Sequence, residues 1–217
     1  TLPRTPAPME PVKDLKLQQK LAMLELRLGL ESDAAALAAM RRTPAQLAAM
    51  EKALADFERM LAINVRAVFV ATQEAVRHMG KGGRIVNIGS VNAWSGEPNL
   101  MPYSVSKGAL MTLTRNLGDT LMREDGVRVN QINPGWVLTE NEAKRKRSHG
   151  LKDDWYADLP KVYAPAGRIL WPEEIAACAA WLLADECGPI SGQVFDLEQH
   201  PFIGRNPPKD STTIPTR

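Results

Sequence analysis

Residues 84–90, Arg-Ile-Val-Asn-Ile-Gly-Ser, decide the fold. The run is short, rich in apolar β-branched residues and ended by glycine, a pattern typical of a strand buried in a parallel sheet. The glycine-rich turn at residues 80–83 separates this strand from a helix predicted over residues 64–79. After the strand, apolar residues at helical spacing predict a helix over residues 103–124.

Two later segments continue the alternation. Residues 127–132 predict a second strand, and residues 192–197 predict a third. Pro172 opens the helix between them. Strand, helix, strand, helix, strand is the order of a parallel α/β layer with right-handed crossovers.

The N-terminal part has a different character. Residues 1–12 hold four prolines and predict a loose arm, whereas residues 13 to about 60 show helical spacing and no strand alternation. Thr43 and Pro44 suit the N-cap and the first position of a new helix. An all-helical segment therefore precedes the α/β layer.

Composition excludes several classes of function. The chain has 217 residues, with 27 Lys and Arg against 25 Asp and Glu, so its net charge of +2 argues against a globally basic nucleic-acid binder. Apolar runs fall short of the roughly 18 residues that span a membrane, and no secretory signal pattern is visible. Two cysteines and three scattered histidines make no metal site on spacing. We expect a cytoplasmic protein with no metal, no membrane and no nucleic-acid partner.

Three residues carry the chemical signal: Ser90, Tyr103 and Lys107. Tyr103 and Lys107 are one helical turn apart and so share a face. A nearby ammonium group favours the phenolate form of a tyrosine, which makes Tyr103 a candidate general acid and base. A hydroxyl at the end of a buried strand, such as Ser90, can hydrogen-bond a reacting oxygen. A Tyr–Lys pair alone also occurs on many exposed helices without any chemical role.

The wider context resembles the short-chain dehydrogenase/reductase family. Asn64-Val65 precedes the strand, Ser90 stands thirteen positions before the Tyr103-x-x-x-Lys107 motif, and Asn133-Pro134-Gly135 follows the next strand. The resemblance covers residues 56–205 and implies an incomplete Rossmann-like parallel sheet of about three strands.

This resemblance also implies roles for single residues. Tyr103 would donate or accept the proton, and Ser90 would hold the substrate oxygen. Lys107 would favour the phenolate of Tyr103 and hold the nicotinamide ribose, while Asn64 would anchor a water molecule in a proton relay. The residues that match the family's contacts to the nicotinamide end are Pro134, Gly135, Val137 and Thr139.

The implied activity is an NAD(P)-dependent oxidoreductase that moves hydride to or from a hydroxyl or carbonyl group. The cofactor is NAD or NADP, and the family's dimer surface implies a homo-oligomer. The stretch 140–165 corresponds to the substrate lid. Within it Asp153, Asp154, Asp158, Trp155 and Tyr156 either line a sugar pocket or simply form part of a mobile lid. The basic run 144–147 is either an exposed helix face or an attraction for an anionic substrate or a cofactor phosphate. The tail at 193–208 resembles a subgroup associated with sugar oxidation.

One family element has no counterpart. Members open with a strand and a glycine-rich turn whose N–H groups cradle the dinucleotide pyrophosphate. Here Gly29 is the only glycine before Gly80. A catalytically silent fusion or truncated remnant, lacking the dinucleotide-binding half, is therefore the alternative to an active enzyme.

The N-terminal helices resemble a different family. Residues 25–39 and 43–47 are similar to the first helices of the effector-binding domain of GntR-type regulators. The predicted organisation is an arm at 1–12, this helical segment at 13–55, the dehydrogenase-like part at 56–205 and a tail at 206–217.

Overall fold

The computed structural model describes residues 15–94, 98–157, 159–161 and 164–200. The predicted arm and tail lie outside these residues. The chain forms two units, Thr1–Leu54 and Ala55–Arg217.

The described part of the first unit, from residue 15 onward, is helical, as predicted. Helix α1 runs over Leu15–Arg41, and α2 runs over Pro44–Leu61 and so continues past the boundary between the units. Thr43 caps α2 in the predicted way: its hydroxyl accepts a hydrogen bond from the Gln46 N–H at 3.2 Å, and the Gln46 side chain accepts one from the Thr43 N–H at 2.8 Å. This reciprocal pairing satisfies two main-chain donors at the helix start.

The second unit contains the predicted parallel sheet. Strands β1 (Arg84–Ile88), β2 (Arg128–Pro134) and β3 (Val194–Leu197) pair in the order β1-β2-β3. Both pairings are parallel, with Ile88 beside Ile132 and Pro134 beside Leu197. The α/β fold class and the three strands are thereby confirmed.

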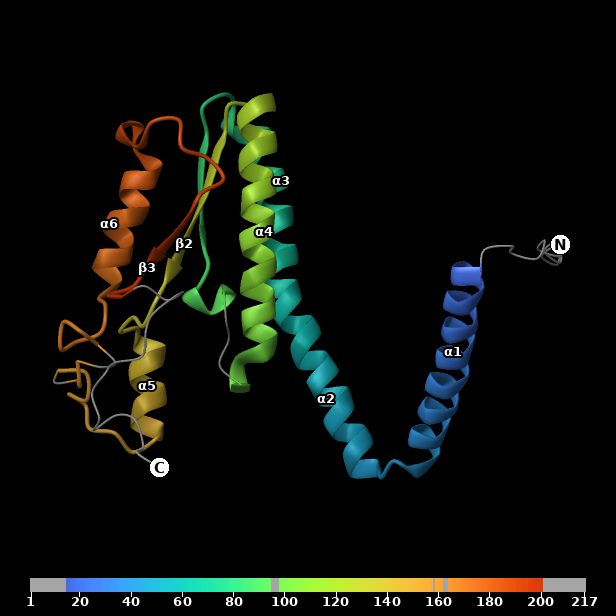
Figure 1. Cartoon of the computed structure of the whole chain (residues 1–217). Helices are drawn as coiled ribbons and strands as arrows, with labels where there is room; N and C mark the ends of the chain where they lie inside the picture. Colours follow the sequence, from blue (N-terminus) through green and yellow to red (C-terminus); the bar gives the residue numbers. More distant parts are fainter. Residues whose placement is uncertain (1–14, 95–97, 158, 162–163, 201–217) are drawn as a thin grey trace. The chain divides into compact units, whose positions relative to one another are not determined.

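Helices cover both faces of this sheet. Helices α3 (Ala67–Met79) and α4 (Met101–Glu124) lie on one side, and α6 (Pro172–Leu183) lies on the other (Figure 1). Between β2 and α6 the chain forms α5 (Glu140–Ser148). Ile132, Leu182 and Cys187 form a buried cluster where α6 packs on the sheet. The sheet therefore lies between two layers of helices.

The helix predicted over residues 64–79 begins differently. Residues Ala62–Arg66 form a π-helical turn, in which the Ala67 N–H donates to the Ala62 carbonyl five residues earlier. Single π-turns of this kind often lie at functional sites because the extra residue changes where neighbouring side chains point. This turn holds Asn64.

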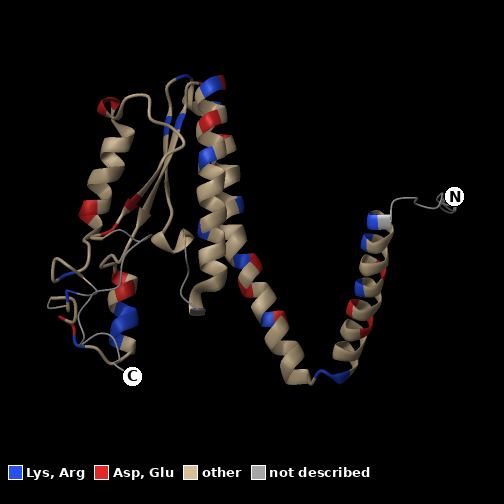
Figure 2. Ribbon diagram, viewed as in Figure 1, with Lys and Arg blue, Asp and Glu red and all other residues tan. Residues whose placement is uncertain are grey.

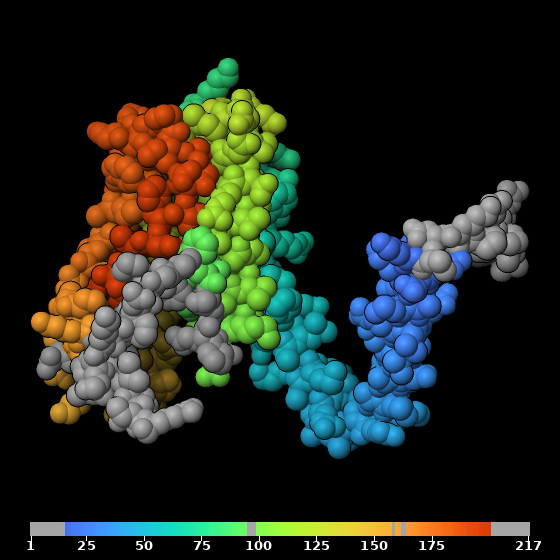
Figure 3. Space-filling view, in the orientation of Figure 1, coloured from blue at the N-terminus to red at the C-terminus, as the bar shows by residue number. Residues whose placement is uncertain are grey.

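The segment before β3 lies directly on α4. A Cβ atom on Gly118 of α4 would come within 2.3 Å of the Gly192 backbone, so only glycine permits this approach. The space-filling view shows this segment against α4 (Figure 3).

None of the helices in the described part of the chain is long and apolar enough to cross a membrane.

Candidate active site

A cavity of about 1160 Å³ lies at the carboxyl ends of β1 and β2. Ligands in open parallel sheets bind at this edge. The structure brings seven of the eight predicted site residues into the wall of this one cavity: Ser90, Tyr103, Lys107, Pro134, Gly135, Val137 and Thr139.

Ser90 is held by both its main chain and its side chain. Its N–H donates to Asn133 Oδ1 at 3.1 Å, and its hydroxyl oxygen accepts from the Asn92 N–H at 3.2 Å. Among the described residues, no acceptor takes the Ser90 hydroxyl proton. The side chain is therefore fixed while its O–H is free to donate to a substrate oxygen.

Lys107 and Tyr103 lie on the same face of α4, as their spacing predicted. The Lys107 ammonium donates to the Ile88 carbonyl at 2.8 Å and lies 5.6 Å from the centre of the Tyr103 ring. Burial lowers the pKa of the Lys107 ammonium. The Tyr103 hydroxyl has no hydrogen-bond partner within the described part of the chain. It is thus available to a ligand.

Asn64 does not line the cavity. Its side-chain amide donates to the Ser106 hydroxyl at 2.9 Å, and that hydroxyl donates to the Tyr103 carbonyl at 2.7 Å. Asn64 therefore supports the backbone that carries Tyr103. Its expected role in holding a water molecule stays a prediction.

The loop after β2 needs a glycine at position 135. A Cβ atom there would lie 1.8 Å from Glu198 Oε2. The same carboxylate oxygen accepts from the Trp136 N–H at 2.8 Å, and the Gly135 N–H donates to the Leu197 carbonyl at 2.9 Å. The ends of β2 and β3 are joined in this way at the cavity wall.

Helix α5 is attached to the same loop. Thr139 caps it by accepting from the Glu142 N–H at 3.1 Å, and the Glu142 carboxylate accepts from the Trp136 indole N–H at 2.9 Å. Trp136 and Glu142 both line the cavity. The sequence did not single them out, because neither residue belongs to the motif that carries the resemblance, and the contact of Trp136 with the distant Glu198 is not visible in a local pattern.

The described lid residues that could line a sugar pocket do not line this cavity, and the sugar substrate stays a prediction. None of Asp153, Asp154, Trp155 and Tyr156 lines the cavity, and Asp158 lies outside the described residues. Trp155 instead stacks on Trp136, with ring centres 5.4 Å apart. The aromatic face of Trp155 therefore packs against the loop after β2.

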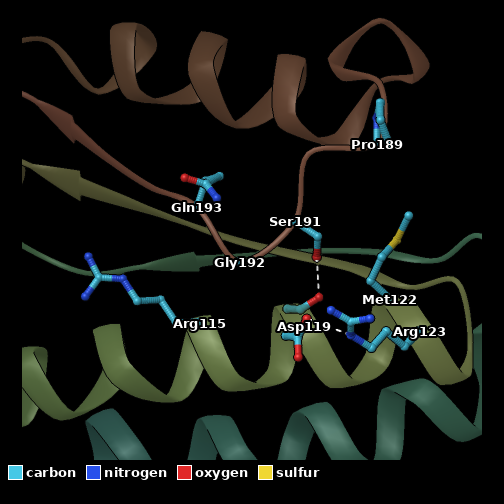
Figure 4. Close-up of a pocket in the computed structure, with 9 residues that line it drawn as sticks. Arg115, Asp119, Met122, Arg123, Pro189, Ser191, Gly192 and Gln193 are labelled. Carbon is cyan, nitrogen blue, oxygen red and sulfur yellow. Dashed lines mark hydrogen bonds and ion pairs between the residues drawn. The ribbon is translucent and has the colours of Figure 1, made fainter.

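A second hollow, of about 490 Å³, lies between α4 and the loop before β3 (Figure 4). Arg115, Asp119 and Ser191 line it, and the Ser191 hydroxyl donates to the Gly118 carbonyl at 2.8 Å. It contains none of the predicted site residues.

Comparison with known proteins decides the family. Residues 33–198 match the family model described as enoyl-(acyl carrier protein) reductase, of the short-chain dehydrogenase/reductase type. The chain belongs to the short-chain dehydrogenase/reductase family. The match begins at residue 33, inside the segment that resembles GntR-type regulators, and that second resemblance stays a prediction.

Named relatives agree with this assignment. Glucose 1-dehydrogenase 2 of Bacillus subtilis is 33% identical over 151 residues, which cover 68% of this chain and 56% of that protein. A short-chain dehydrogenase family structure from Francisella tularensis has 27% identity and a TM-score of 0.58, covering 65% of this chain and 60% of that one.

A structure of 4-hydroxyisoleucine dehydrogenase complexed with NADH has 26% identity and a TM-score of 0.52, covering 65% of this chain and 57% of that one. The chain thus spans little more than half the length of the relatives that it matches.

Proposed function

We propose that this cavity catalyses hydride transfer between a nicotinamide cofactor and a hydroxyl or carbonyl substrate. In the oxidising direction, an alcohol and NAD(P)⁺ give a carbonyl compound, NAD(P)H and a proton. The observation that carries the proposal is that Ser90, Tyr103 and Lys107 line one cavity at the end of β1.

The residues present suit the nicotinamide end of the cofactor, which when bound would supply or accept the hydride. Lys107 would hold the ribose, and the loop of Pro134, Gly135, Val137 and Thr139 would border the nicotinamide. Because Gly135 has no side chain, Glu198 can approach its backbone, and the loop stays close to β3. For the pyrophosphate the sequence offers no glycine-rich turn, since Gly29, the only glycine before Gly80, lies within α1.

Proton transfer falls to the chain's own residues. In the reducing direction the Tyr103 hydroxyl donates its proton to the carbonyl oxygen, and the Ser90 hydroxyl donates a hydrogen bond to the same oxygen. The Lys107 ammonium stabilises the phenolate left behind. Because burial already lowers the pKa of Lys107, this ammonium can also pass a proton onward at less cost than an exposed lysine.

Substitution of Tyr103 tests the proposal. Reduction of a panel of aldehydes, ketones and aldoses by NADH and NADPH should fall about 10²–10⁴-fold in Tyr103→Phe. Tyr156→Phe is the matched control, because Tyr156 packs edge-on against Trp155 and Trp171 and does not line the cavity. Aldoses belong in the panel because one relative is named glucose 1-dehydrogenase.

Equal rates in the two variants would remove Tyr103 from the mechanism. The alternative, a catalytically silent protein, predicts a separate result: no saturable binding of NADH or NADPH up to millimolar concentration.

A further inference from the structure

The basic run of α5 divides into two pairs. Lys144 pairs with Glu140 at 2.6 Å and Arg147 with Asp153 at 3.5 Å, and neither cation lines the cavity. Arg145 and Lys146 do line it. Figure 2 shows the concentration of basic residues along this helix. The two pairs therefore have different surroundings on one helix.

Lys146 is a largely buried cation without a hydrogen-bond acceptor. Its side chain is 23% exposed, and its ammonium is 3.8 Å from Glu142 Oε1, which is too far for a hydrogen bond. The ammonium lies over the rings of Trp136 and Trp155, 4.9 and 5.4 Å from their centres. No side chain or carbonyl within the described residues accepts from its three N–H groups. Cation–π attraction stabilises the charge but leaves these donors unused.

The carboxylate beside Lys146 is already occupied. Glu142 accepts from the Trp136 indole and from the Arg145 guanidinium at 2.7 Å. Burial raises the pKa of Glu142, but the hydrogen bonds from Trp136 and Arg145 and the nearby positive charges outweigh burial and lower it overall. The single negative charge of Glu142 is thus shared between two cations.

The remaining carboxylate of the cavity wall does not balance this charge. Glu198 accepts from the N–H groups of Trp136 and Gln199, at 2.8 and 2.7 Å. Its hydrogen bonds are made to the main chain and to neither cation of α5. The lid side of the cavity keeps an excess of positive charge.

We propose that Arg145 and Lys146 bind an oxyanion, a carboxylate or phosphate group carried by the substrate. This inference rests on the proposed function. The guanidinium keeps N–H groups beyond the one bonded to Glu142, and its planar fork suits an oxyanion. The substrate class is then an anionic hydroxy or keto compound, which includes sugar acids and sugar phosphates.

Binding of simple anions tests this without requiring turnover. Malonate and inorganic phosphate are titrated at constant ionic strength, with tryptophan fluorescence as the signal, because Trp136 and Trp155 contact the Lys146 ammonium. Glycerol serves as the neutral probe. We expect saturable binding of an anion by the wild type, at least about tenfold weaker binding by Lys146→Gln, and no change for the matched control Lys144→Gln.

Arg145→Lys keeps the positive charge and shows whether anion affinity depends on the planar fork of the guanidinium. Folding of every variant is checked by the near-ultraviolet circular dichroism of its tryptophans. Equal anion affinity in Lys146→Gln and Lys144→Gln, or a signal that does not saturate in the wild type, would overturn the inference.

A second titration separates the two sources of an oxyanion. If Arg145 and Lys146 bind the substrate, malonate should still bind when NADH is saturating. If NADH instead competes with malonate, the two cations bind the cofactor phosphates, and the assignment to the substrate is overturned. Lys146-dependent malonate binding by a chain that does not bind NADH would support the anion site and refute the proposed function. The two hypotheses therefore fail separately.

Discussion

Asn133 connects Ser90 to the rest of the buried polar network, and its removal should be costly. The fully buried Asn133 amide oxygen accepts from the Ser90 N–H at 3.1 Å and from Gln131 Nε2 at 2.7 Å. Its amide nitrogen donates to Asp196 Oδ1 at 2.9 Å. Asn133→Ala would leave two buried donors without an acceptor.

The expected magnitude follows from those two donors. Each buried group left unsatisfied costs about 1–3 kcal/mol, so the free energy of unfolding should fall by about 2–6 kcal/mol. Asp196 loses one hydrogen bond but keeps that of the Trp94 indole at 2.9 Å, so it adds little. A loss of this size is a large part of the stability of a small domain.

Asn133→Asp tests the same network through the pH dependence of stability. It keeps the acceptor but puts a second carboxylate oxygen where the amide nitrogen lies, next to Asp196 Oδ1. Two carboxylates at this distance hold one proton, which raises the pKa of one of them in the folded state. The deficit of this variant should therefore be largest at neutral pH and shrink as the pH falls.

Urea unfolding followed by tryptophan fluorescence measures these changes as a shift in midpoint. Asn116→Ala is the control, because its exposed amide only donates to the Thr112 carbonyl of its own helix, at 2.9 Å. We expect the control to stay within about 0.5 kcal/mol of the wild type. If Asn133→Ala did so too, the network would not hold the strand ends together.

Two other predictions follow from the same structure. In Gly89→Ala the new Cβ would lie 2.0 Å from Asn133 Oδ1. The free energy of unfolding, measured from the urea midpoint, should therefore fall by about 1–3 kcal/mol. Gly29→Ala is the control, because its Cβ would meet open space on α1 and should not destabilise the protein. Hydrogen bonds from Arg168 and then from the Trp171 N–H lower the pKa of Glu174 to about 2. Glu174→Gln should therefore be less stable than the wild type at neutral pH, and this difference should vanish as the pH falls from about 4.5 towards 2, which acid unfolding monitored by circular dichroism would show.

Local sequence patterns predicted the sheet and the core of the candidate site. The run at residues 84–90 has the composition of a buried strand, and the spacing of Tyr103 and Lys107 fixes their shared face. Both depend only on neighbours along the chain. The resemblance added the place of the loop after β2.

Contacts between distant segments could not be read in this way. Glu198 and Trp136 meet because β3 pairs with β2 and because Gly135 has no side chain, and no local pattern contains either fact. The π-turn at Asn64 and the stacking of Trp155 on Trp136 are likewise not visible in any local pattern. In the structure Asn64 donates to Ser106, and Trp155 does not line the cavity.

Binding of NADH to the wild-type chain tests the central claim most directly. Trp136 lines the cavity, so bound NADH should quench its emission and gain fluorescence by energy transfer. We predict a saturable signal below millimolar NADH that Trp136→Phe reduces more than Trp181→Phe, because Trp136 lines the cavity and Trp181 does not. A signal that rises linearly to millimolar NADH, equal in both variants, would contradict a nicotinamide site in this cavity.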